Sequence, residues 1–129
     1  MKFKILIRDI MIAPGKRFDP SEFSESDVIE RIKKIGFNVL CAVTHSPQDA
    51  PYDKMFQTNV DLIRKADIFV AVLKDYGKDL TAEVGMAYAW KKPSLGIDFN
   101  AKKDDVMSYY ALDKIIRPEE LEETLKKLK

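Results

Sequence analysis

The most informative segment of the chain is Ala66–Pro93, which reads ADIFVAVLKDYGKDLTAEVGMAYAWKKP. Residues 67–73 are apolar without alternation, which is typical of a parallel strand that is covered on both faces. A polar loop follows, and a helix of small residues is expected from about Leu80 to Lys91, where a proline stops it. Since ligands of open α/β sheets bind beyond the carboxyl ends of the strands, Glu83 near the start of this helix is a candidate site residue.

The segments on either side predict the same alternation of strands and helices. We expect further strands at Lys4–Arg8, Phe37–Val43, Ser94–Ile97 and Lys114–Ile116. We expect further helices over Val28–Ile35, Met55–Lys65, Lys102–Tyr110 and Pro118–Leu128. Ser26 and Gly36 are the expected caps of the first of these helices. The alternation implies right-handed crossovers, and therefore a flavodoxin-like or Rossmann-like α/β sandwich with about five mainly parallel strands and helices on both faces.

Composition limits the possible functions. The 129 residues are 46% hydrophobic and 33% charged, which predicts one domain over residues 1–129. The formal net charge of +1, with Lys and Glu interspersed, argues against a nucleic-acid surface and favours small molecules or copies of the chain as partners. Cys41 is the only cysteine, and no apolar run approaches the roughly 20 residues of a membrane span. Met1 leads directly into an expected strand, so we predict a soluble, cytoplasmic protein without a signal peptide.

The small residues and the glutamate of the helix expected from Leu80 to Lys91 both have simple structural explanations. Its small residues, among them Gly85, would let the backbone lie close to the sheet, although glycine costs roughly 1 kcal/mol relative to alanine inside a helix. Glu83 in the first turn would be favoured by the helix dipole by about 0.3–1 kcal/mol. Residue type and position alone therefore favour a structural glutamate over a catalytic one.

The segment Asn59–Ala89, with Ala66-Asp67 leading into a strand and Glu83-Val-Gly-Met-Ala beyond it, resembles the nucleoside 2-deoxyribosyltransferase family. A second match, Asp105-Val-Met-Ser-Tyr, is similar to the family's Asn-x-Met segment, where one subunit completes a neighbour's active site. The resemblance covers most of the chain from about Val28 onward. It implies a homo-oligomer with a shared active site, which transfers 2-deoxyribose between nucleobases in nucleotide salvage.

By this resemblance, Glu83 attacks the anomeric carbon of a deoxynucleoside and holds the sugar as a glycosyl ester until a second base or water collects it. The departing base needs a proton, and the family usually has an aspartate six residues before the glutamate, where this chain has Gly77. Asp79 lies four residues before Glu83 and is either the acid or the helix N-cap. Asp75 is a substrate-binding candidate or a solvated side chain.

Three further positions are implied to bind substrate. Asn59 stands where the family commonly has a carboxylate that contacts the base or orients the nucleophile, and its amide can bind a base edge but cannot act as an acid. Asp105 stands where an asparagine from the adjacent subunit contacts the 5′-hydroxyl, and its charge would favour a nucleoside over a nucleotide. Met107 either lines the pocket or belongs to the core.

The long connection over residues 9–25 departs from the family, which has glycine and aromatic residues there. Phe18 or Phe23 could stack on a base instead, and Lys16 and Arg17 could hold a 5′-phosphate or be solvated. His45 has no partner at ligand spacing, and neither a P-loop nor a GxGxxG motif occurs, so we predict neither a metal nor a cofactor.

Three hypotheses follow. The first is a 2-deoxyribosyltransferase that acts through Glu83. The second is a nucleoside or nucleotide N-glycosidase, a hydrolase in which water resolves the glycosyl enzyme. The third is a nucleotide-binding module that keeps the fold without the activity, which the altered first loop and the displaced aspartate favour.

Overall fold

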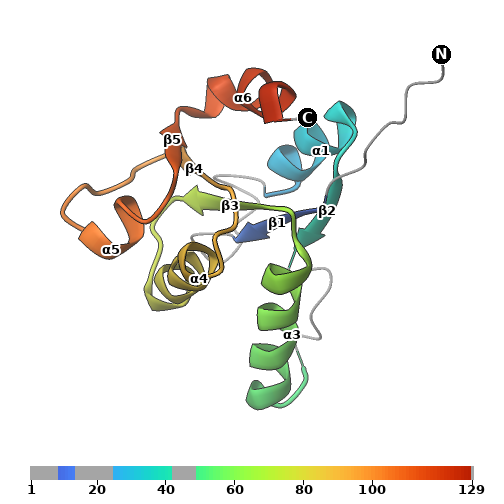
Figure 1. Ribbon diagram of the computed structural model, residues 1–129, viewed down its shortest axis with the longest axis vertical. Helices are drawn as coiled ribbons and strands as arrows, with labels where there is room; N and C mark the ends of the chain where they lie inside the picture. Colours follow the sequence, from blue (N-terminus) through green and yellow to red (C-terminus); the bar gives the residue numbers. More distant parts are fainter. Residues whose placement is uncertain (1–8, 14–24, 42–48, 129) are drawn as a thin grey trace.

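A computed structural model describes residues 9–13, 25–41 and 49–128, and within these ranges five parallel strands form one sheet (Figure 1). The strand order is β2-β1-β3-β4-β5. The strands are β1 (Asp9–Ala13), β2 (Asn38–Cys41), β3 (Ile68–Leu73), β4 (Ser94–Asp98) and β5 (Lys114–Ile116). Each neighbouring pair is parallel. The predicted α/β fold class is therefore confirmed.

β3 is the central strand, as its unbroken apolar sequence predicts. All six of its residues are buried, and it pairs with β1 on one side and β4 on the other. Met11 lies opposite Phe69, and Val70 lies opposite Leu95. Because β3 is hydrogen-bonded on both sides, the position of its carboxyl end, where the loop to the next helix begins, is well defined.

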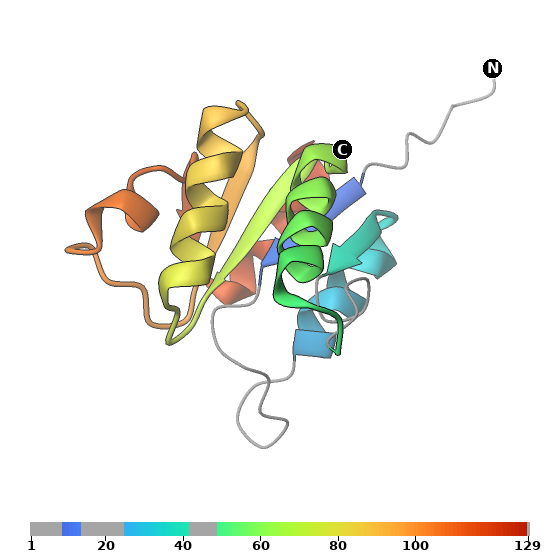
Figure 2. The ribbon, with the colours of Figure 1, turned by 90° about the horizontal axis from the view of Figure 1, so that it is seen from below.

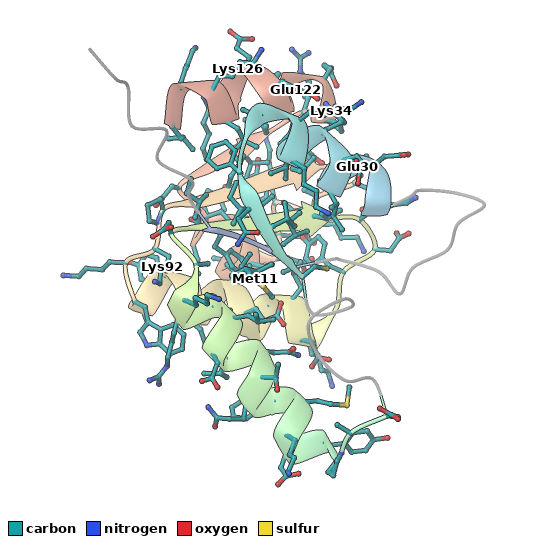
Figure 3. The ribbon with its side chains drawn as sticks, turned by 90° about the vertical axis from the view of Figure 1, so that its right-hand side faces the viewer. Met11, Glu30, Lys34, Lys92, Glu122 and Lys126 are labelled. Carbon is teal, nitrogen blue, oxygen red and sulfur yellow. The ribbon has the colours of Figure 1, made fainter. Side chains whose placement is uncertain are left out.

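Helices cover both faces of the sheet (Figure 2). α1 (Glu25–Ile35) and α6 (Leu121–Leu128) pack on one face, where Ile32 and Leu125 join the core formed by alternate strand residues. Glu122 of α6 forms an ion pair with Arg31 of α1, whose Nη2 also donates to the Pro118 carbonyl at 2.6 Å. Figure 3 shows Glu122 of α6 next to Lys34 of α1.

The other face carries α3 (Tyr52–Lys65) and α4 (Lys78–Ala89), which lie side by side. Ile63 and Val84 bring these helices onto Met11, Phe69 and Leu73 of the sheet. A four-residue helix, α5 (Val106–Tyr109), lies beside α4 before the chain returns to β5. No helix of the described ranges is long and apolar enough to cross a bilayer.

Two local predictions are wrong. Asp9–Ala13, which we placed in the first loop, is β1, and the strand predicted at Lys4–Arg8 lies outside the described residues. α1 begins at Glu25, so Ser26 is inside the helix rather than its cap. The prediction for Gly36 is confirmed: its φ of 107° is one that side-chain-bearing residues rarely adopt, and its amide donates to the Lys33 carbonyl at 2.9 Å.

Candidate active site

A pocket of about 440 Å³ opens between α3 and α4. Three polar side chains line it together with aromatic and aliphatic ones. The lining residues are Tyr52, Met55, Phe56, Asn59, Val60 and Ile63 from α3, and Asp79, Ala82, Glu83 and Met86 from α4. The structure therefore brings together three of the six predicted site residues, namely Asn59, Asp79 and Glu83.

The start of α4 determines where the two carboxylates lie. Gly77 is the N-cap and supplies no side-chain hydrogen bond, so Asp79 is the second residue of the helix and the alternative that it is the helix cap is wrong. Asp79 is the acidic residue of the first turn, whereas Glu83 lies in the second turn. Because the helix dipole acts mainly within the first turn, it does little to stabilise a carboxylate at Glu83. Residues four apart share a helix face, and both side chains line the pocket.

Burial and a like charge act on Glu83. Loss of hydration in the apolar pocket, with a smaller contribution from the negative charge of Asp79, raises the pKa of Glu83 to about 7. A buried carboxylate is normally stabilised by a cation or by N–H donors. Among the described residues, none forms a hydrogen bond or ion pair with the Glu83 side chain. A carboxyl group that titrates near neutrality in a pocket is typical of functional sites.

Asn59 is the third polar group of the pocket. Its Oδ1 atom is buried and has no hydrogen-bond partner among the residues that the structure describes. An unsatisfied buried acceptor costs about 1–3 kcal/mol. The pocket therefore contains an acceptor that the described protein residues leave unsatisfied.

Asp105 and Met107 do not reach this pocket within one chain. They line an open groove of about 850 Å³ on another side of α4, together with Gly85, Tyr88 and Tyr110. Met107 is 75% exposed, so the alternative that it belongs to the core is wrong. Gly85 is also exposed, and a Cβ built on it would meet no atom within 4 Å. The explanation that Gly85 allows close packing on the sheet is therefore wrong as well.

Asp75 occupies a different position from the other candidates. It has a φ of 47° and lies in the loop between β3 and α4. Its amide donates to Oδ1 of Asn100 at 2.9 Å, and its Oδ1 accepts from Nδ2 of Asn100 at 2.6 Å. These bonds join its loop to the loop after β4, and Asp75 does not line the Glu83 pocket.

The aromatic side of the pocket was not predicted from the sequence. Tyr52 and Phe56 precede Asn59 at spacings of seven and three residues, which place all three on one side of α3. Tyr52 is 89% exposed and Phe56 is 59% exposed. The aromatic pair followed by an amide at helical spacing is a signal that could have identified this face.

The remaining sequence candidates cannot be compared with the structure. Lys16, Arg17, Phe18, Phe23 and His45 lie outside the described residues. Within the described ranges, no three His, Cys, Asp or Glu residues gather where they could hold a metal ion.

A pocket beside the helix that follows a central parallel strand is typical of α/β proteins that bind small ligands. Comparison with known protein families gives a match: the family model of nucleoside 2-deoxyribosyltransferase matches residues 12–112 of this chain. The chain belongs to the nucleoside 2-deoxyribosyltransferase family. A search of curated protein sequences found no match.

Solved structures share the fold at low sequence identity. A conserved protein from Enterococcus faecalis superposes with a TM-score of 0.74 at 17% identity, covering 96% of this chain and 100% of its own. A 2-deoxyribosyltransferase from Bacillus psychrosaccharolyticus has a TM-score of 0.72 at 17% identity, with coverages of 88% and 90%. A 2-deoxyribosyltransferase from Leishmania mexicana has a TM-score of 0.57 at 24% identity, with coverages of 70% and 63%.

Proposed function

We propose that this protein transfers 2-deoxyribose between nucleobases and that Glu83 is the nucleophile. The observation that carries the proposal is the position of Glu83 in an apolar pocket with Asp79 one helical turn before it. Family membership supports the same class of reaction. An ionised carboxylate beside apolar side chains is well suited to stabilise an oxocarbenium-like transition state.

In the first half-reaction, an oxygen of the Glu83 carboxylate forms a bond to the anomeric carbon while the bond from that carbon to the base nitrogen breaks. The electron pair of the broken bond stays on the base, which takes up a proton. In this proposal Asp79, which lines the same pocket, delivers this proton. In the second half-reaction an incoming base attacks the anomeric carbon, Glu83 leaves as a carboxylate, and the proton of the incoming base returns to Asp79.

We further propose that the pocket is completed by a second copy of the chain. Asp105 and Met107 lie away from Glu83 in one chain, and Met107 is largely exposed. In the family resemblance this segment serves a neighbouring subunit. The expected result is an active homo-oligomer by light scattering, in which Met107→Lys lowers both assembly and transfer. A fully active monomer would remove Asp105 and Met107 from the site.

The test is base exchange between a deoxynucleoside and a different free base. We expect a new deoxynucleoside from the wild type and from Glu30→Ala, a control on the exposed surface of α1, and none from Glu83→Ala. Mass spectrometry of a quenched reaction should locate a sugar adduct on the peptide that contains Glu83. Release of free base without exchange would instead indicate an N-glycosidase, and an adduct on another residue would contradict the assignment of the nucleophile. No turnover of any deoxynucleoside or its monophosphate would exclude both enzymes and leave a binding module.

A further inference from the structure

The α3 side of the pocket combines flat aromatic surface with one amide. Tyr52, Phe56 and Asn59 all line it, and most of the surface of both aromatic residues is exposed. Exposed aromatic rings stack readily on planar heterocycles, since every nucleobase has a π-face. This side of the pocket therefore has the composition of a base-binding surface, whereas the carboxylates lie on α4.

The amide of Asn59 requires a hydrogen-bond donor, which a ligand can supply. Its buried Oδ1 needs a hydrogen-bond donor, and no described residue supplies one. The other two polar groups that line the pocket, Asp79 and Glu83, are acceptors when they are ionised. A ligand that brings its own N–H group to Asn59 would satisfy this acceptor and remove an unfavourable contribution to the folded state.

We propose that Asn59 selects nucleobases that carry an exocyclic amino group, with the base stacked on the aromatic residues of α3. This inference rests on the proposed function, because it names the base that the Glu83 site accepts. An amide pairs well with an edge that presents an amino group beside a ring nitrogen, as adenine does. A base without the amino group leaves the Asn59 oxygen unpaired and binds less well.

Binding of free bases tests the proposal without requiring turnover. Titration calorimetry measures the affinity of the wild-type protein for adenine, purine and hypoxanthine. At the same ring carbon, adenine carries an amino group, purine carries no substituent and hypoxanthine carries an oxo group. We expect adenine to bind about tenfold more tightly than the other two, which is the factor expected when a buried acceptor gains its hydrogen bond. Asn59→Leu, a substitution of similar shape without polar atoms, should equalise the three affinities. Gln57→Leu removes an exposed amide from the same helix and should preserve the preference.

Each other outcome overturns the inference. Equal binding of adenine and purine by the wild type, or a preference that survives in Asn59→Leu, would show that Asn59 does not read the base. Equal binding of adenine and hypoxanthine would show that a ring N–H, not the amino group, satisfies the amide. Failure to bind any of the three bases would also reject a base site on α3. Transfer activity without base preference rejects this inference alone, whereas base preference without transfer rejects the proposed reaction alone.

Discussion

Replacing Glu83 by glutamine should stabilise the protein at alkaline pH and have little effect in acid. The pKa of a glutamate is near 4.5 in the unfolded chain, and burial with the nearby charge of Asp79 raises that of Glu83 to about 7. The folded state therefore holds the proton more tightly than the unfolded state does. It follows that the wild type loses stability as the pH rises from 4.5 through 7. Glutamine has nearly the same shape but no charge to lose.

The size of the effect follows from the two pKa values. A difference between 4.5 and about 7 corresponds to about 3 kcal/mol at pH 8 and above, and to nothing below pH 4. For a domain of this size, this corresponds to an increase in Tm of about 10 °C. An effect of this size is large compared with the total stability of about 5–15 kcal/mol that is usual for a domain.

Urea unfolding followed by the fluorescence of the single tryptophan, Trp90, measures the difference across this pH range. Glu30→Gln is the matched control, because Glu30 is exposed on α1 and Figure 3 shows it projecting away from the protein. We expect the control to follow the wild type at every pH. If Glu83→Gln were no more stable than the wild type at pH 8, the carboxylate would not lie in an apolar environment, and the reasoning that connects its burial to catalysis would fail.

Three other perturbations have defined outcomes. Asp79→Asn should lower kcat/KM, because it removes the proposed proton donor, and it should move the acidic limb of the remaining activity to lower pH, because the charge of Asp79 contributes to the raised pKa of Glu83. An unchanged kcat/KM would contradict the acid role, and an unmoved limb would show that the charge of Asp79 does not act on Glu83. Glu122→Gln should lower the free energy of unfolding at pH 7 by about 0.5–1 kcal/mol, because the hydrogen bond from Arg31 lowers the pKa of this partly exposed carboxylate to about 2. Chemical denaturation at several pH values should show that loss disappearing between about pH 4.5 and 2, and a constant loss would exclude the ion pair as its cause. Gly96→Ala should cost about 1–3 kcal/mol in thermal unfolding, since a Cβ there would come within 2.8 and 2.9 Å of two leucine side chains, and an unchanged Tm would mean that the core repacks freely.

Most of the fold could be predicted because the decisive signals are local. The apolar run of β3 and the helical periodicities on either side are properties of short segments, and they fix the order of the elements. The first strand could not be assigned in this way. Lys4–Arg8 and Asp9–Ala13 are adjacent apolar segments, and what identifies Asp9–Ala13 as a strand is its pairing with β2 and β3, which is a long-range property.

The candidate site could be predicted from the sequence only at residues whose side-chain type itself suggests a chemical role. The carboxylates of α4 and the amide of Asn59 were found from spacing and resemblance together, and they do line one pocket. Tyr52 and Phe56 were not found, because periodicity places an aromatic residue on a helix face without showing whether the core or a pocket covers that face. The same ambiguity explains the errors at Gly85 and Met107, since small and flexible apolar residues suit a core and a binding groove equally well.

The strongest indication of a functional site is that stability does not explain its polar groups. Glu83 lies beyond the turn where the helix dipole would favour it, and its charge is unfavourable in the apolar pocket. Asn59 holds a buried acceptor without a described partner in the same pocket. Leucine or glutamine at these positions would make a more stable protein. Two unfavourable polar groups on neighbouring helices are expected where a ligand satisfies them, and a nucleoside offers what each lacks: an electrophilic carbon for the carboxylate and a donor for the amide.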